Sequence, residues 1–462
     1  MHNYIWKSNY LLIGLLFCCS IQAGNTVGQF AEDAPDRLVE YLQINTVNPP
    51  GNEALGVAFF AKYLAAAGIE FQVGESAPGR GNIWAKLPGG DKQGIVLLNH
   101  IDVVVADEKY WSVDPYKGLV KDGYIYGRGA LDMKGLGIAQ FQAFLSLAAS
   151  GEKLNRDVWF LATADEEAGG QYGAGWMVKH HPEMFEKVGF LLNEGGFGFR
   201  VGDDVSFIVE VTQKVPLWLR LTATGNPGHG SAPQVHTAVT RLFKAGHRIT
   251  TTNFKPRVIK PVKRMFSDIA ASQPMGFKEQ YTNISKHILD TEFMLALQTR
   301  NPQHHSLLRD TCSVTRIEGS SKINVVPAEA KFELDCRLLP DQSIDVFVKE
   351  LELLIADPNI KIERLMEFSP ASSETETELF DHIQRVTKKH YPGSQVIPSV
   401  STGFTDSHFF RDLGIVSYGF GPFMATRSDF QGVHGNDEKV SVVNMVNGTI
   451  LLRDLLDSFA VK

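Results

Sequence analysis

The sequence has no concentration of basic residues. Its 462 residues include 45 lysines and arginines against 52 aspartates and glutamates, which gives a net charge of −7 at pH 7. It contains no basic stripe and no arginine-rich arm, so the composition does not support a nucleic-acid partner. With 44% hydrophobic and 21% charged residues, the composition is ordinary for a core-forming globular protein. We therefore expect a small-molecule or peptide partner, and the length suits two domains.

The apolar stretch near the N-terminus, "YLLIGLLFCCS", is too short to cross a bilayer, which takes roughly 20 residues. Lys7 precedes this stretch, and "IQA" ends it at the small residue Ala23. This pattern is typical of a secretory signal peptide. We predict that residues 1–23 are a signal peptide and that the protein is exported, periplasmic or secreted, with no membrane span after cleavage. An uncleaved membrane anchor is the alternative.

Cysteine is scarce, with four residues in the chain, of which Cys18 and Cys19 would leave with the signal peptide. Cys312 and Cys336 remain, in a compartment where disulfides persist. They lie on two predicted antiparallel strands, and their midpoint, Asn324, falls in the connection "SSKINVVPAE". Directly opposed residues bring Cβ atoms to about 4.5–5.5 Å, and a disulfide needs roughly 3.5–4.5 Å. A regular register would oppose the two cysteines, whereas a bulge would shift the register by one and turn them apart, so the sequence leaves the disulfide open.

The first part of the chain alternates between helical and strand patterns. Short apolar runs without clean alternation are typical of parallel strands that are covered on both faces. Three such runs are 94–99, 157–164 and 188–194, and the predicted helices are 36–44, 53–68 and 134–151, the last two ending at glycines. Strands separated by helices predict an α/β fold with a mostly parallel sheet.

The middle of the chain has a different pattern. Segments 206–225, 311–319 and 328–340 alternate polar and apolar residues, as antiparallel strands with one exposed face do. We predict an α+β domain over 215–370, inserted into a larger α/β domain formed by 24–214 and 371–462. Segment 251–305 is poorly patterned, and the sequence assigns it no role.

Acidic and histidine side chains stand where the predicted strands end. His100 and Asp102 are two residues apart on one strand, so their side chains can face the same side. In open α/β sheets, sites form beyond the carboxyl ends of the strands, so we expect these side chains to converge. The set comprises His100, Asp102, Asp132, Glu166, Glu167, Glu194 and His434.

So many carboxylates cannot share a dry pocket unless cations neutralise them. Histidine nitrogens and carboxylate oxygens together suit zinc. This set offers too many ligands for one tetrahedral ion, but it fits two ions with one bridging carboxylate, an arrangement that activates a water molecule. Each residue alone has a simpler interpretation, such as a core histidine or a helix cap. The simpler interpretations do not explain why every apolar strand ends in such a residue.

The motifs "NHIDVV", "GRGALDMKG", "DEEAGG", "NEGG", "GHGSAP" and "VHGNDE" occur in an order and spacing that resemble the M20 family of zinc metallopeptidases. That family includes glutamate carboxypeptidases, aminoacylases, acetylornithine deacetylase and succinyl-diaminopimelate desuccinylase. The resemblance runs from about residue 35 to the end, except for 251–305. It implies a zinc-exopeptidase-like catalytic domain and an inserted, ferredoxin-like lid through which the protein forms a homodimer. One departure is Val105, where the family often has proline.

The resemblance also implies roles for the strand-end residues. Asp132 would bridge two zinc ions, with cobalt or manganese as substitutes, and Glu166 would be the general base. Asp102 would hold His100 through its other ring nitrogen, as carboxylates behind metal-bound histidines do. The implied metal ligands are His100, Asp132, Glu167, Glu194 and His434.

Within the lid, the resemblance places His229 in the active site of the partner subunit, where it would steady the oxyanion. Arg337 would bind a substrate carboxylate, because its planar fork suits bidentate contact. Asn324 is a further lid candidate, and the glycine loop around Gly403 would line the substrate end of the site.

These inferences predict an exported di-zinc hydrolase that cleaves an amide bond of a peptide or N-acyl amino acid. Glutamate at position 194 resembles the aminoacylase and carboxypeptidase branch, whereas aspartate there resembles the aminopeptidase and dipeptidase branch. We therefore expect a substrate with a free carboxylate. The alternatives are a di-zinc aminopeptidase or dipeptidase, and a non-catalytic binding protein on the same fold. The last is disfavoured because neither the base nor any ligand is missing.

Overall fold

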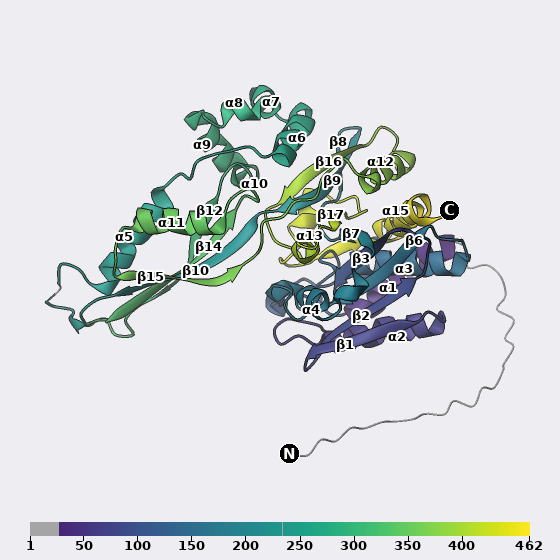
Figure 1. The fold of residues 1–462 in the computed structure, drawn as a ribbon, viewed down its shortest axis with the longest axis horizontal. Coiled ribbons are helices and arrows are strands. Elements are labelled where there is room, and N and C mark those ends of the chain that lie inside the picture. Colours follow the sequence, from purple (N-terminus) through teal and green to yellow (C-terminus); the bar gives the residue numbers. More distant parts are fainter. Residues whose placement is uncertain (1–26, 233) are drawn as a thin grey trace, which may run out of the picture.

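The computed structural model describes residues 27–232 and 234–462. The predicted signal peptide, 1–23, lies outside the described residues. Among the helices of the described part, none is long and apolar enough to span a bilayer. Figure 1 shows two bodies, a broad one that holds the C-terminus and an elongated one that projects from it.

The broad body is built on a nine-stranded mixed sheet. Its centre, β6-β3-β7-β17, is parallel, as the uninterrupted apolar runs predict. The order along the sheet is β1 (Phe71–Ala77), β2 (Arg80–Leu87), β6 (Arg156–Thr163), β3 (Lys92–His100), β7 (Val188–Asn193), β17 (Val416–Gly419), β9 (Asp204–Gln213) and β16 (Gln395–Ser401), with β8 (Gly198–Val201) paired to β9.

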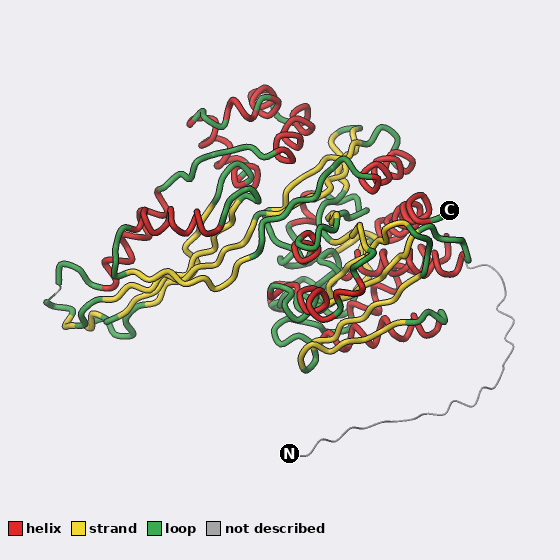
Figure 2. The backbone as a smooth tube through the Cα atoms, viewed as in Figure 1, coloured by secondary structure: helices red, strands yellow, loops and turns green. Residues whose placement is uncertain are grey.

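Helices cover both faces of this sheet (Figure 2). Residues Ile95 and Leu97 of β3 join the core on one face, while Val96 and Leu98 join the core on the other. The first face is covered by α1 (Val27–Leu42), α2 (Glu53–Ala66), α3 (Lys134–Ser150), α12 (Glu378–His390) and α15 (Val442–Ala460), and the second by α4 (Ala174–His180) and α13 (Ser407–Arg411). The predicted helix ends are confirmed, because Gly68 and Gly151 take left-handed backbone angles there.

A small three-stranded sheet supports one side of this body. Its order is β18 (Lys439–Ser441), β5 (Tyr124–Tyr126) and β4 (Leu119–Lys121). Pairing of β18 with β5 brings the loop before β18, which contains the short helix α14 (Arg427–Phe430), close to the turn that follows β5. The motifs "GRGALDMKG" and "VHGNDE" therefore lie next to each other.

The elongated body contains a four-stranded antiparallel sheet with its own core. Alternate residues of β14 are buried, so the predicted half-exposed pattern is confirmed here. The order is β12 (Thr311–Glu318), β14 (Glu329–Leu338), β10 (Val215–Thr224) and β15 (Ile360–Glu367), covered by α5 (Ala238–Thr251) and α11 (Ile344–Ile355). The short strands β11 (Gly228–His229) and β13 (Val325–Val326) pair at its far end. We refer to this sheet and its two helices as the lid.

The alternating segment 206–225 is divided between the two bodies. Its first half is β9, which pairs with β16 in the large sheet, and its second half is β10 of the lid. Strand β9 alternates because one of its faces packs in the main core through Phe207, Val209 and Val211. The chain passes from one sheet to the other at Lys214.

Segment 251–305, which the sequence left without a role, is largely helical. Its apolar residues form a core with Ile397 and Val400 of β16, so the segment packs on the edge of the large sheet. The helices are α6 (Lys260–Ile269), α7 (Met275–Thr282), α8 (Ile284–His287), α9 (Thr291–Arg300) and α10 (Pro302–Ser306). We refer to α6–α10 as the helical insertion.

The structure contains a disulfide between Cys312 and Cys336, a pairing that the sequence left open. The two residues are directly opposed on β12 and β14, with Cα atoms 4.0 Å apart. A register shift does occur, between Val314 and Arg316, but it lies beyond the cysteines and leaves them paired. The bond attaches the edge strand β12 to the centre of the lid sheet.

We predict that Cys312 and Cys336 resist alkylation in protein that is unfolded without reductant, and that both react after reduction. Peptide mass mapping would locate the modified residues. Opening the bond, for example by Cys312→Ser, should lower the stability of the lid by about 3 kcal/mol, the entropy that a loop of this size contributes. Alkylation of both cysteines before reduction would rule the bond out.

Candidate metal centre

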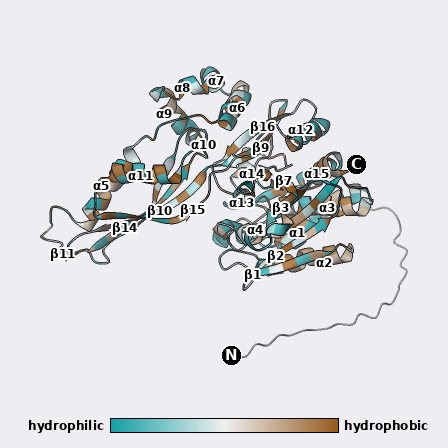
Figure 3. Cartoon of the chain, in the orientation of Figure 1, coloured by the Kyte–Doolittle hydropathy of each residue, from teal (hydrophilic) through white to brown (hydrophobic). Residues whose placement is uncertain are grey.

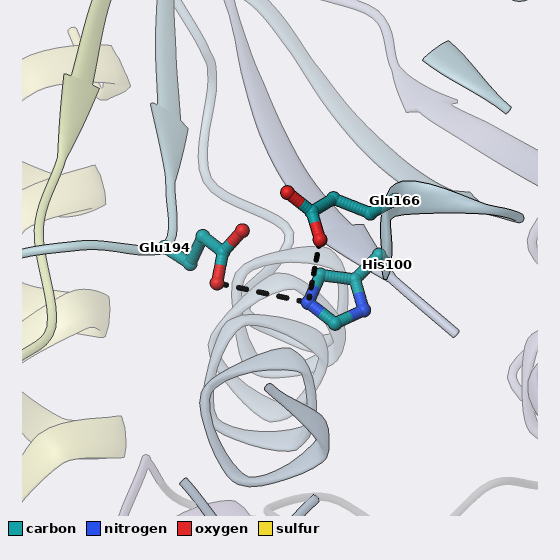
Figure 4. A group of neighbouring side chains, drawn as sticks. All are labelled: His100, Glu166 and Glu194. Atoms are coloured by element: carbon teal, nitrogen blue, oxygen red, sulfur yellow. Dashed lines mark ion pairs between the residues drawn. The ribbon is translucent and has the colours of Figure 1, made fainter. Parts of the chain in front are cut away.

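The ends of three neighbouring parallel strands supply the first group of side chains. His100 is the last residue of β3 and pairs with Thr163 at the end of β6. Glu166 follows β6 in a short 3-10 turn, and Glu194 follows β7. Figure 4 shows the three side chains converging. The Nε2 atom of His100 lies 3.6 Å from Glu194 Oε2 and 4.0 Å from Glu166 Oε2.

Asp132 stands between two histidines. Its Oδ1 lies 3.2 Å from Nε2 of His100, and its Oδ2 lies 3.1 Å from Nε2 of His434. Nε2 of His434 is also 3.2 Å from Oε2 of Glu167. Ligands bound at 2.0–2.1 Å to one tetrahedral zinc are roughly 3.3 Å apart, so these separations suit two ions that share Asp132.

Distance alone does not separate ligand from base among the two adjacent glutamates. One group that could hold an ion is His100, Glu166 and Glu194, and another is His100, Asp132 and Glu167. Both glutamates are thus within reach of the same histidine. The donor atoms of the two groups are imidazole nitrogen and carboxylate oxygen, which zinc prefers.

Glu438 holds the turn that carries Asp132. Its carboxylate accepts hydrogen bonds from the main-chain N–H groups of Gly129, Leu131 and Asp132 at 2.7–3.0 Å. It also pairs with Nη1 of Arg128 at 2.6 Å, and Nη2 of the same arginine donates to the carbonyl of Gly435 at 2.6 Å. Arg128 and Glu438 therefore fix the Asp132 turn and the His434 loop relative to each other.

Burial and mutual repulsion perturb the pKa values of the acids. Burial, followed by the charge of Glu194, raises the pKa of Glu166 well above its usual value. Burial and the charge of Asp132 raise the pKa of Glu194 to about 8, and the same two causes raise the pKa of Glu167. Burial would lower the pKa of His100, but the neighbouring carboxylates, Glu194 first, raise it. Without cations, this centre holds extra protons.

Residues 96–458 match peptidase family M20/M25/M40. This chain belongs to that family. The match confirms the resemblance inferred from the motifs, and it establishes a metal-dependent hydrolase that cleaves a peptide or amide bond.

Two curated relatives illustrate the range of the family. Mouse N-fatty-acyl-amino acid synthase/hydrolase PM20D1 is 29% identical over 369 residues, which cover 77% of this chain and 72% of the mouse protein. Pig aminoacylase-1 is 27% identical over 429 residues, which cover 91% of this chain and 94% of the pig protein.

Solved structures of low sequence identity share the fold. The M20 family metallo-carboxypeptidase Sso-CP2 from Sulfolobus solfataricus superposes with a TM-score of 0.70 at 20% identity, covering 92% of this chain and 98% of its own. Human carnosine dipeptidase 1 gives a TM-score of 0.64 at 18% identity, covering 93% and 98%. The predicted α/β fold class is thereby confirmed.

The lid candidates of this M20 protein lie at two different ends of the lid. His229 and Asn324 meet at the far end of the lid, where β11 is labelled in Figure 3, and the N–H of Gly230 donates to the carbonyl of Asn324 at 2.9 Å. Arg337 lies at the opposite end of the lid sheet, opposed to Pro216, near the point where the chain passes from β9 of the large sheet to β10 of the lid. Gly403 is exposed in the loop after β16.

The structure changes one predicted contact around the centre and adds two residues that the sequence analysis did not identify. Nδ1 of His100 is 2.9 Å from the main-chain carbonyl of Asp102 and 3.5 Å from its Oδ1, so the carbonyl is the nearer partner. Arg128 and Glu438 were missed as positioning residues, although both stand inside the quoted motifs. Their signal was a charged residue four positions from a proposed ligand in each motif, Arg128 before Asp132 and Glu438 after His434.

We predict that metal-free protein becomes less stable as the pH rises. The pKa of Glu194 is about 8 in the folded protein and 4.5 in a free side chain, and that of His434 is about 10 rather than 6.5. In both cases the folded state binds more protons, so its stability is full below the unfolded pKa and is lost as the pH rises through the folded pKa. The melting temperature of chelator-treated protein should fall between about pH 5 and pH 9.

Added zinc should remove the fall of the melting temperature with pH, because zinc takes the place of the bound protons. The stabilisation by zinc should therefore grow with pH. Calorimetric titration in buffers of different ionisation enthalpy would detect protons released on binding. The variant Glu194→Gln is the control, since it removes one of the titrating groups and should flatten the curve. A melting temperature of the metal-free protein that rises with pH would contradict the prediction.

Proposed function

We propose that the protein is an exported di-zinc hydrolase that removes a residue from a peptide, or an acyl group from an N-acyl amino acid, and that its substrate carries a free carboxylate. The observation that carries this proposal is Asp132, whose two oxygens face two different histidines. Supporting it, the relatives include aminoacylase-1 and an N-fatty-acyl-amino acid synthase/hydrolase. The disulfide supports export, since such bonds persist in oxidising compartments.

In this proposal the ligands divide into two sets that share Asp132. His100, Asp132 and Glu194 would hold one zinc, and Asp132, Glu167 and His434 would hold the other, with cobalt or manganese as substitutes. The side chain of His434 is 54% exposed, so the second set opens toward solvent, from which a substrate would enter.

Bound metal ions would lower the pKa of a water molecule to about 7 and polarise the substrate carbonyl. Glu166 takes a proton from the attacking water and passes it to the leaving nitrogen. Burial raises the pKa of Glu166 above its usual value, and a raised pKa favours a carboxyl group that can hold a proton and then donate it. Asp102 holds the turn that carries Glu166 by accepting its main-chain N–H at 3.1 Å.

The lid supplies the substrate contacts in this proposal. Nη1 of Arg337 is buried and has no hydrogen-bond partner among the described residues, which suits a guanidinium that awaits a carboxylate. Its Nε and Nη2 donate to the two carboxylate oxygens of Asp335 at 2.7 and 3.3 Å, and these bonds orient the guanidinium so that Nη1 is left for the substrate. Gly403, beside Phe404, would line the substrate site of its own chain, whereas Asn324, near His229 at the far end of the lid, would reach the site of the partner subunit.

His229 is proposed to act on the partner subunit of a homodimer formed through the lid. Nδ1 of His229 accepts a hydrogen bond from the main-chain N–H of Ser231 at 3.2 Å. The ring proton therefore resides on Nε2, where it can be donated to an oxyanion. Within its own chain His229 lies at the lid end remote from the metal centre, so a second subunit is needed to bring it there.

We predict that Glu166→Gln abolishes turnover while two metal ions per chain remain. The substitution keeps the size of the side chain and removes the base. The test is a hydrolysis screen of the zinc-loaded protein and the variant against N-acyl amino acids and dipeptides, with metal content measured in parallel. If wild type cleaves none of these compounds, the proposed function fails. If the variant loses metal, Glu166 and Glu167 have exchanged roles.

We predict that His229→Ala loses about 10²–10³-fold in kcat, the effect of removing one oxyanion donor, with its metal content unchanged. Mixing it with Glu166→Gln under conditions that exchange subunits should restore part of the activity, because one mixed site then has both groups. Subunit exchange would be followed by a mass label on one variant. Proven exchange without recovery would exclude a site completed by the partner.

A further inference from the structure

The turn that carries Glu166 and Glu167 is fixed by one buried carboxylate. Oδ1 of Asp102 accepts the main-chain N–H of Glu166 at 3.1 Å, and Oδ2 accepts that of Glu167 at 3.2 Å. The turn begins at Asp165, whose φ of +71° is unusual for a residue with a side chain. The position of the proposed base therefore depends on how Asp102 and Asp165 are held.

Asn48 holds both of these aspartates. Its Nδ2 donates to Oδ2 of Asp102 at 2.8 Å and to Oδ1 of Asp165 at 3.3 Å. Asn48 is 7% exposed, so this one amide group joins two carboxylates out of reach of bulk water. A buried carboxylate that loses its donor is destabilised, and it would reorient toward another one.

Arg80 fixes the orientation of that amide. Its Nη2 donates to Oδ1 of Asn48 at 3.0 Å, which leaves Nδ2 directed at the two aspartates. The same Nη2 is 3.3 Å from Oδ1 of Asp165, and Nη1 pairs with Glu53 at 2.6 Å. Gly51, at φ +81°, passes so close that a side chain there would overlap the guanidinium.

We propose that Asn48 and Arg80 are positioning residues that hold the base Glu166 in place through Asp102 and Asp165. They touch neither substrate nor reacting atoms, and they act on the main chain of the turn rather than on the metal ligands directly. The inference rests on the proposed function, because it assigns Asn48 the role of positioning Glu166, the proposed base.

The test is Asn48→Ala, assayed with the best substrate of the screen. We expect kcat to fall by 10- to 100-fold, the usual effect of removing a partner behind a catalytic group, with KM within about threefold and metal content unchanged. The matched control is Asn52→Ala, an exposed asparagine at the start of α2 whose side chain makes no capping hydrogen bond, and it should behave as wild type.

A double-mutant cycle with Glu166→Asp separates positioning from a general structural effect. If Asn48 acts through the base, the loss of kcat in Asn48→Ala, Glu166→Asp should be clearly smaller than the product of the single losses. A multiplicative loss would overturn the proposal. So would a kcat within threefold of wild type, or a fall in kcat that matches a loss of metal.

Arg80→Lys keeps the test available if Asn48→Ala does not fold. The lysine keeps the charge opposite Glu53 but cannot also orient Asn48, so kcat should fall while KM and metal content hold. Unchanged kcat in a folded Arg80→Lys protein would overturn the role of Arg80. Wild type that hydrolyses no amide would instead contradict the proposed function, which keeps the two failures distinct.

Discussion

The rest of this structure depends on a repulsion that the fold must accommodate: several carboxylates lie within a few ångströms of one another at one edge of a sheet. Two like charges about 4 Å apart repel by about 4 kcal/mol even at an effective dielectric constant of 20. A few such pairs would exceed the 5–15 kcal/mol that typically stabilises a domain. Burial, and after it this repulsion, raises the pKa values of Glu166, Glu167 and Glu194. Protons or metal ions must offset it, and only metal ions leave the carboxylates free to act.

The two turns that carry the acids are built in the same way. In each, a buried carboxylate accepts successive main-chain N–H groups: Glu438 for the turn of Asp132, and Asp102 for the turn of Glu166. Each carboxylate is in turn linked to an arginine, directly in the case of Arg128 and through an asparagine in the case of Arg80. The carboxylates of Glu438 and Asp102 therefore hold the main chain of the two turns in place. The turns do not depend on the metal-ligand side chains for their conformation.

Much of the centre could be predicted because its signals are local. A strand that ends in His100 and an apolar run that ends at Glu194 are visible in any short window. The opposed cysteines follow from a regular register. The supporting contacts were not predictable, since Asn48 is 54 residues from Asp102 and Glu438 is 306 residues from Asp132. The helical insertion was missed because its short helices bury their apolar residues against β16, a strand that comes some 90 residues later.

The helical insertion also explains how the large sheet ends. Strand β16 is the last in its sheet, and an uncovered edge strand invites pairing with other chains. The insertion packs on β16 through its own apolar core.

The insertion is also connected to the point where the chain enters the lid, since Nζ of Lys214 donates to the carbonyls of Ser306 and Arg309 and to Oγ1 of Thr311 at 2.8–3.0 Å. Burial lowers the pKa of this lysine to about 7, and three acceptors offset part of that cost. Thr311 begins β12, the strand that carries Cys312. Lys214, at the point where the chain enters the lid, therefore contacts both the insertion and the disulfide-bonded edge strand of the lid.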